Sequence, residues 1–185
     1  AHAATLYGQQ YDDLFSMMRA HYSTTYFAAL LAKRPIEYAA KTFRLLSAHC
    51  PVDVAVYDTN GNSCGYTKDG VAYNDNISPI RIVVMEDEKF IEIPDDGNEY
   101  IVKYTGTDDG TMKIQDQIYD LETGEVESEK VFEGIVLEEG KQFESAIDAE
   151  DTNKTDLYVI DSDGDKISSV DVNGDETTLY SYDIT

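Results

Sequence analysis

Three acidic stretches carry the residue types best suited to hold a metal ion. In each, aspartate or asparagine alternates with other residues around a glycine, and Ca²⁺ takes several carboxylate and carbonyl oxygens from one tight loop. The calcium ligands predicted from this spacing are Asp58, Asn60 and Asn62, together with Asp161, Asp163 and Asp165. A looser third copy runs from Asp171 to Asp175. The alternative is that these are solvated hairpin turns, since Asn-Gly and Asp-Gly recur in turns for local steric reasons.

These stretches do not match a helix-flanked calcium loop. Such a loop needs an acidic ligand at its twelfth position. Counting from Asp161 gives Val172, and counting from Asp58 gives Asp69, whose flanks have the alternation of strands. No cofactor other than calcium is therefore expected.

Nucleophilic catalysis has little support in the sequence. His49 and Cys50 are adjacent, but neighbouring side chains diverge on a helix and alternate on a strand. No G-x-S-x-G turn is present, and a serine triad would have to use His2, His21 or His49. Phosphate-binding glycine motifs are also missing. We expect the chain not to be an enzyme.

Tyrosine is the residue type that could bind sugars. The chain has 14 Tyr and no Trp. Exposed aromatic rings form sugar platforms, but Tyr is also a common strand residue that packs its ring and exposes its hydroxyl. The candidates are Tyr57, Tyr66, Tyr73, Tyr100, Tyr104, Tyr119, Tyr180 and Tyr182.

Two kinds of element must position these residues. Apolar residues recur at helical spacing over residues 3–49, with breaks near 20–24 and 33–35. From Pro51 the period changes to two, and Asn60-Gly61 predicts a two-residue hairpin turn that places Tyr57 opposite Cys64. That register separates Cys50 from Cys64, so we expect two free thiols.

Further strands are expected wherever short β-prone runs lie between acidic, glycine-containing turns. They are 80–85, 89–93, 99–106, 111–120, 125–132, 141–147, 157–160, 166–170 and 177–182. This spacing is typical of an antiparallel sandwich.

Charge divides the chain at the same place. The net charge is −23, yet residues 1–50 carry five Lys and Arg against three Asp and Glu. The rest carries nine against thirty-four. This excess repels nucleic acid and anionic membranes. No apolar run reaches the ~20 residues of a membrane span, so membrane insertion is not expected.

The run from Cys50 to Asn62 and the run from Tyr100 to Met112 resemble an accessory β-sandwich module of secreted or cell-surface proteins of Gram-positive gut anaerobes. The resemblance covers roughly residues 50–148. It implies a C-terminal position after a catalytic or adhesive domain, and a location outside the cell. It implies no functional residue.

We therefore expect a mostly β fold with N-terminal helices (α+β): a helical segment at 1–49, an immunoglobulin-like antiparallel β-sandwich at 50–150 and a C-terminal β extension at 151–185. The helical segment is either part of this fold or the end of a preceding domain. The expected function is a non-catalytic accessory or interaction module whose partner is a neighbouring domain or a cell-surface or extracellular ligand. The alternatives are the C-terminal fragment of a secreted lipase- or esterase-like hydrolase and a calcium-stabilised adhesin or carbohydrate-binding module.

Overall fold

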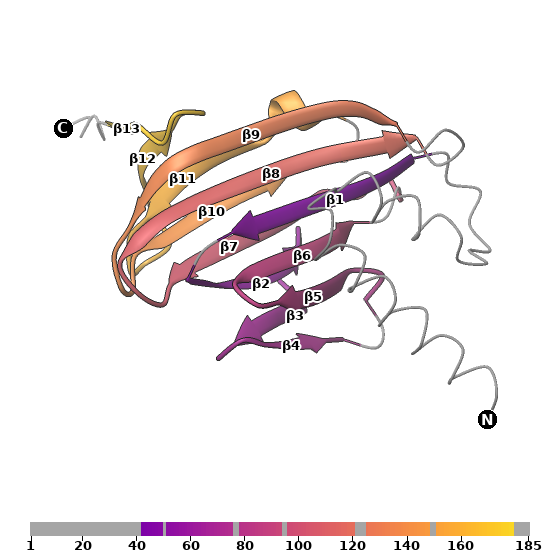
Figure 1. The fold of residues 1–185 in the computed structure, drawn as a ribbon, viewed down its shortest axis with the longest axis horizontal. Coiled ribbons are helices and arrows are strands. Elements are labelled where there is room, and N and C mark those ends of the chain that lie inside the picture. The colour runs from indigo at the N-terminus through magenta and orange to yellow at the C-terminus, as the bar shows by residue number, and fades with distance from the viewer. Residues whose placement is uncertain are drawn as a thin grey trace.

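The computed structural model describes residues 42–49, 51–75, 78–93, 96–120, 125–148 and 151–179. These residues form two antiparallel sheets and one short 3₁₀ helix, η1 (Thr152–Lys154) (Figure 1). No helix in this part of the chain is long and apolar enough to cross a membrane. The expectation of two antiparallel sheets is confirmed, and residues 1–41 lie outside the described part.

The first sheet has five strands with β1 at its centre. Its spatial order is β5 (Arg81–Met85), β6 (Glu88–Ile93), β1 (Thr42–His49), β8 (Gly110–Asp120) and β9 (Val126–Leu137).

The second sheet has eight strands and includes the whole C-terminal meander. Its spatial order is β13 (Glu176–Thr178), β12 (Lys166–Val170), β11 (Asp156–Ile160), β10 (Gln142–Ile147), β7 (Tyr100–Gly106), β2 (Val52–Asp58), β3 (Ser63–Lys68) and β4 (Val71–Asn74). The strands expected at 157–160 and 166–170 therefore extend this sheet.

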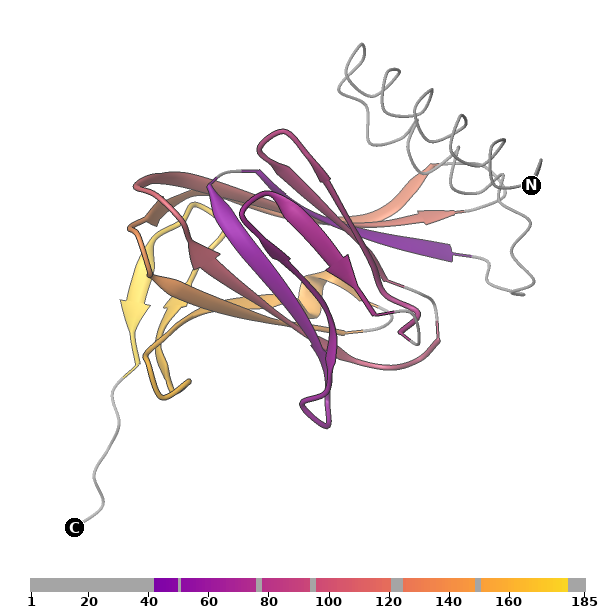
Figure 2. The ribbon, with the colours of Figure 1, turned by 90° about the horizontal axis from the view of Figure 1, so that it is seen from below.

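One hydrophobic core lies between the two layers (Figure 2). Alternate residues of most strands point into it, as the two-residue period of a strand requires. Leu46 and Ile91 enter from the five-stranded sheet, and Val54, Tyr104 and Phe143 enter from the eight-stranded sheet.

The chain changes sheet five times, and three of these crossings lie next to one another: β1 to β2, β7 to β8 and β9 to β10. Backbone hydrogen bonds tie these crossings together. The Thr107 N–H donates to the Pro51 carbonyl at 2.9 Å, and the Gly106 N–H donates to the Lys141 carbonyl at 2.9 Å. A Cβ on Gly106 would lie 2.4 Å from the Glu138 carbonyl oxygen, so this approach requires glycine.

A buried ion pair joins β1 to β8 inside the molecule. Arg44 donates from Nε and Nη2 to the two carboxylate oxygens of Asp116, at 2.8 and 2.6 Å. Arg44 Nη2 also donates to Thr155 Oγ1 at 2.9 Å, and Thr155 Oγ1 in turn donates to Asp116. Because Asp116 is completely buried, this network fixes the register of β1 and the position of the chain after η1.

The expectation of helix was wrong for residues 42–49, which form β1. Both faces of this strand are buried, with Leu46 on one side and Leu45 and Ser47 on the other. A strand that is buried on both faces has no alternation of apolar and polar residues, so its apolar residues also fit a helical spacing.

The two-residue turn expected at Asn60-Gly61 was also wrong. Tyr57 pairs with Ser63, and a bulge lies between Val56 and Tyr57. The Asp58 N–H donates to the Asn62 carbonyl, and Gly61 adopts a φ of 81°. The turn therefore has three residues between its closing pair, with glycine in the left-handed conformation. Cys64 is a buried free thiol, and Cys50 lies outside the described residues.

Candidate functional site

The three acidic stretches form hairpin turns of one geometry. In each, the carboxylate of the first aspartate accepts hydrogen bonds from the backbone N–H groups two and four residues later, at 2.8–3.0 Å. The N–H of that aspartate donates to the carbonyl four residues on, and the glycine N–H donates back to the aspartate carbonyl. The first aspartates are Asp58, Asp161 and Asp171. The repeat noticed in the sequence is therefore a repeat of turn structure.

The predicted calcium ligands of each set lie in one turn, but the two turns stay apart. Asp58 pairs with Tyr100 at the start of β7, whereas Ile160 aligns through Gln142 with Thr105 near its end. The turns therefore lie at opposite ends of the eight-stranded sheet. Within the described residues, no three His, Cys, Asp or Glu side chains lie close enough to hold a metal ion.

Hydrogen bonding holds the pKa of Asp58 below its ordinary range. Asn62 is the main cause, since both its side-chain amide and its backbone N–H donate to the carboxylate. In contrast, burial raises the pKa of Tyr100, and its hydroxyl donates to Asp96 Oδ2 at 2.7 Å. Asp58 thereby closes the turn after β2, and Tyr100 links the start of β7 to the loop before it.

A serine, a histidine and a glutamate form a hydrogen-bonded chain on β1 and β6. Ser47 Oγ lies 3.2 Å from His49 Nε2, and His49 Nδ1 lies 2.8 Å from Glu88 Oε1. Ser47 and His49 share a face because they are two residues apart on a strand, and His49 pairs with Glu88 across the ladder. This is the order of contacts in a nucleophile–base–acid triad. The sequence reasoning missed it because residues 3–49 were expected to be helical.

The surroundings of Ser47 in this hydrogen-bonded group differ from those of a catalytic serine. Ser47 is 1% exposed, so its Oγ presents no open surface to a substrate. Strand β1 pairs with β6 on one side and β8 on the other, so its backbone N–H groups are used in ladders and do not form an oxyanion hole. The half-buried His49 and Glu88 then act as a polar connection between two strands.

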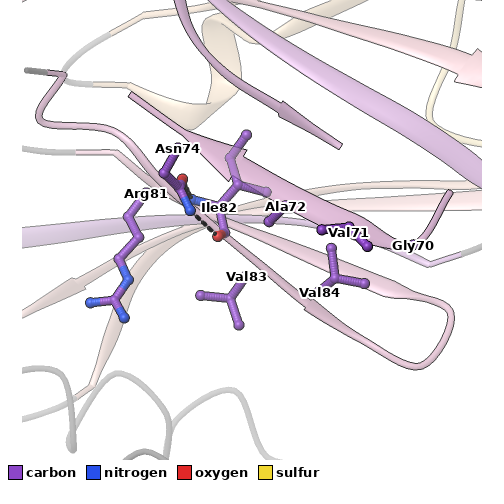
Figure 3. Close-up of a pocket in the computed structure, with 8 residues that line it drawn as sticks. All are labelled: Gly70, Val71, Ala72, Asn74, Arg81, Ile82, Val83 and Val84. Atoms are coloured by element: carbon purple, nitrogen blue, oxygen red, sulfur yellow. Dashed lines mark hydrogen bonds between the residues drawn. The ribbon is translucent and has the colours of Figure 1, made fainter. Parts of the chain in front are cut away.

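A shallow groove of about 410 Å³ lies between the edge strands β4 and β5 (Figure 3). Among its lining residues, the Asn74 amide bonds to both backbone groups of Ile82, accepting from the N–H at 2.6 Å and donating to the carbonyl at 2.9 Å. The Asn74 side chain thus forms with Ile82 the two hydrogen bonds that a neighbouring strand would otherwise form. It connects the edge strand β4 of one sheet to the edge strand β5 of the other. Val71, 51% exposed, lies on the rim.

Two of the candidate tyrosines lie on β3 and β4, on the outer side of the eight-stranded sheet. Tyr66 on β3 pairs with Tyr73 on β4, and their rings stack at a centroid distance of 4.9 Å. They are 42% and 47% exposed. Tyr100, Tyr104 and Tyr119 are buried instead, and Tyr180 and Tyr182 lie outside the described residues.

No protein-family model, no curated protein sequence and no solved structure matches this chain.

Proposed function

We propose that this chain is a non-catalytic accessory or interaction module of an extracytoplasmic bacterial protein, with an immunoglobulin-like arrangement of its sheets and N-terminal helices. The proposal rests on the observation that the side chains best suited to catalysis or metal binding either form hydrogen bonds that hold the fold or are buried. The turn aspartates accept backbone N–H groups, and Ser47 is buried. The net charge of −23 suits a soluble surface in an extracellular medium.

A direct test compares the chain with its Ser47→Ala variant in ester hydrolysis and in labelling by a fluorophosphonate. We expect neither protein to hydrolyse p-nitrophenyl esters above the buffer rate, and neither to be labelled. Labelling of the parent chain that Ser47→Ala abolishes would instead support the hydrolase alternative, with His49 as its base.

The setting of the module is tested through the gene that encodes it. We expect the open reading frame to include a secretion signal and a catalytic or adhesive domain upstream. An intact upstream nucleophile motif whose histidine lies within residues 1–49 would favour the hydrolase fragment.

Carbohydrate binding is a second candidate, favoured by the exposed stacked pair Tyr66 and Tyr73. Rings in this position offer an apolar surface to the faces of sugar rings. Isothermal titration with soluble plant and bacterial polysaccharides tests this candidate. It predicts binding that Tyr66→Ala and Tyr73→Ala each abolish, while Tyr158→Ala, on a distant strand, leaves it unchanged.

A further inference from the structure

The middle of the outer face of the five-stranded sheet is buried, although this face points away from the core. Strand alternation places Leu45 and Ser47 on the opposite side of β1 from the core residue Leu46. The ladders place Phe90 opposite Ser47, and Glu92 and Gln117 beside Leu45. Six residues in the middle of this face are at most 6% exposed: Leu45, Ser47, Phe90, Glu92, Gln117 and Tyr119. At one end of the same face, His49 and Glu88 are 30% and 29% exposed.

A sheet cannot bury such side chains by itself. Side chains stand roughly perpendicular to a sheet, so a large ring on an uncovered face keeps its outer end in water. The other sheet provides the comparison, because Tyr66 and Tyr73 on its outer side are 42% and 47% exposed. Tyr119, on the outer face of the five-stranded sheet, is 0% exposed. A further layer must therefore lie over Tyr119.

The described elements do not provide that layer. The main neighbours of β1, β6 and β8 are strands of their own sheet and η1. The contact of η1 is on the inner side, where Thr155 bonds Asp116, and Asp116 pairs with the core residue Leu46. The covering residues thus belong to the rest of the chain.

We propose that residues 1–41 form this layer, as helices packed on the face around Leu45, Phe90 and Tyr119. Their length suits the role. The internal stretches outside the described residues have one to four residues, and the C-terminal one has six, whereas the N-terminal one has 41 and leads directly into β1. Two helices of ~15 residues are each ~22 Å long, and three strands span only ~10–15 Å.

The chemistry of the segment also fits. Apolar residues recur in it at helical spacing, among them Leu14, Phe15 and Met18. Residues 1–41 carry four Lys and Arg against three Asp and Glu, whereas residues 42–185 carry ten against thirty-four. The segment is thus the one long stretch whose charge suits a face that contains the buried carboxylate of Glu92.

Photo-crosslinking in the full chain tests the proposal. p-Benzoylphenylalanine replaces Phe90 in one variant, Tyr119 in a second and the exposed Tyr73 in a control, and cross-linked peptides are mapped in a mixture of ¹⁴N- and ¹⁵N-labelled protein. We expect cross-links within one chain from positions 90 and 119 to residues 1–41, and none to that segment from position 73. Cross-links only to residues 42–185, links between copies, or no links from either position would overturn the proposal.

A gentler variant covers the case in which the bulky probe prevents folding. Ser47→Cys places a thiol on the same face with almost no change in shape. We expect its alkylation to become at least about tenfold faster when Phe15→Asp is added, because the layer is then released more often. Gln10→Asp adds the same charge at a polar position and should leave the rate unchanged. Equal rates in all three proteins would contradict the assignment.

Discussion

At the residue scale, the aspartate that opens each hairpin turn matters through the hydrogen bonds that its carboxylate accepts. For Asp58 these bonds lower the pKa in the folded state below its ordinary value. The folded protein therefore binds this proton less readily than the unfolded chain. The resulting stability is fully present above the ordinary carboxyl pKa and is lost as the pH falls through the lower, folded-state value.

This predicts a pH-dependent effect of Asp58→Asn. We expect the variant to be less stable than the parent chain in urea unfolding at pH 7, and the difference to shrink at pH 3. Asp163→Asn is the matched control, because it removes the same charge from an equivalent turn without removing the acceptor of the backbone N–H groups. An identical loss at both pH values would show that the carboxylate charge is unimportant.

We expect the stability of the protein to be most sensitive to substitution of Asp116. It is completely buried and neutralises Arg44 through two hydrogen bonds. Asp116→Ala leaves an uncompensated buried charge, so we expect a loss of about 3–5 kcal/mol in unfolding free energy. The double variant Arg44→Met/Asp116→Leu should recover most of it, while Glu133→Gln at the exposed Lys113 pair should cost less than about 1 kcal/mol. A double variant as unstable as Asp116→Ala would contradict this account.

At the scale of elements, the three neighbouring crossings between the sheets, β1 to β2, β7 to β8 and β9 to β10, depend on close backbone contact. Gly106→Ala would place a Cβ 2.4 Å from the Glu138 carbonyl, so the crossings must separate. We expect a cost of about 1–3 kcal/mol in thermal or urea unfolding. Gly110→Ala, four residues along the chain, meets Pro51 at an ordinary 3.7 Å and should change the stability by less than about 0.5 kcal/mol. Equal effects would mean that the crossing is not tightly packed.

At the scale of the whole molecule, calcium is the ligand whose effect is simplest to measure. Asp58, Asp161 and Asp171 already use a carboxylate oxygen to close their turns. We therefore expect the same thermal midpoint with millimolar calcium and with chelator. A rise that requires Asp161, Asp163 and Asp165 would support the calcium hypothesis, because a ligand that binds only the folded state raises its midpoint.

The sequence by itself determined the local features of the β region. Alternation over Val52, Val54 and Val56 and the glycine-containing turns are encoded within a few residues, so most strands were predictable. The three related turns were visible for the same reason. The exact turn at Asn60 was not, because Asp58 accepts two N–H groups and selects a longer turn.

Only the tertiary structure decided the role of residues 42–49. Strand β1 lies at the centre of a sheet with both faces buried, so its pattern does not distinguish a strand from a helix. The Ser47–His49–Glu88 chain and the Arg44–Asp116 pair depend on that strand and on partners far away in the sequence. Such contacts depend on pairing between distant segments of the chain. The residue spacing within one segment does not indicate that pairing.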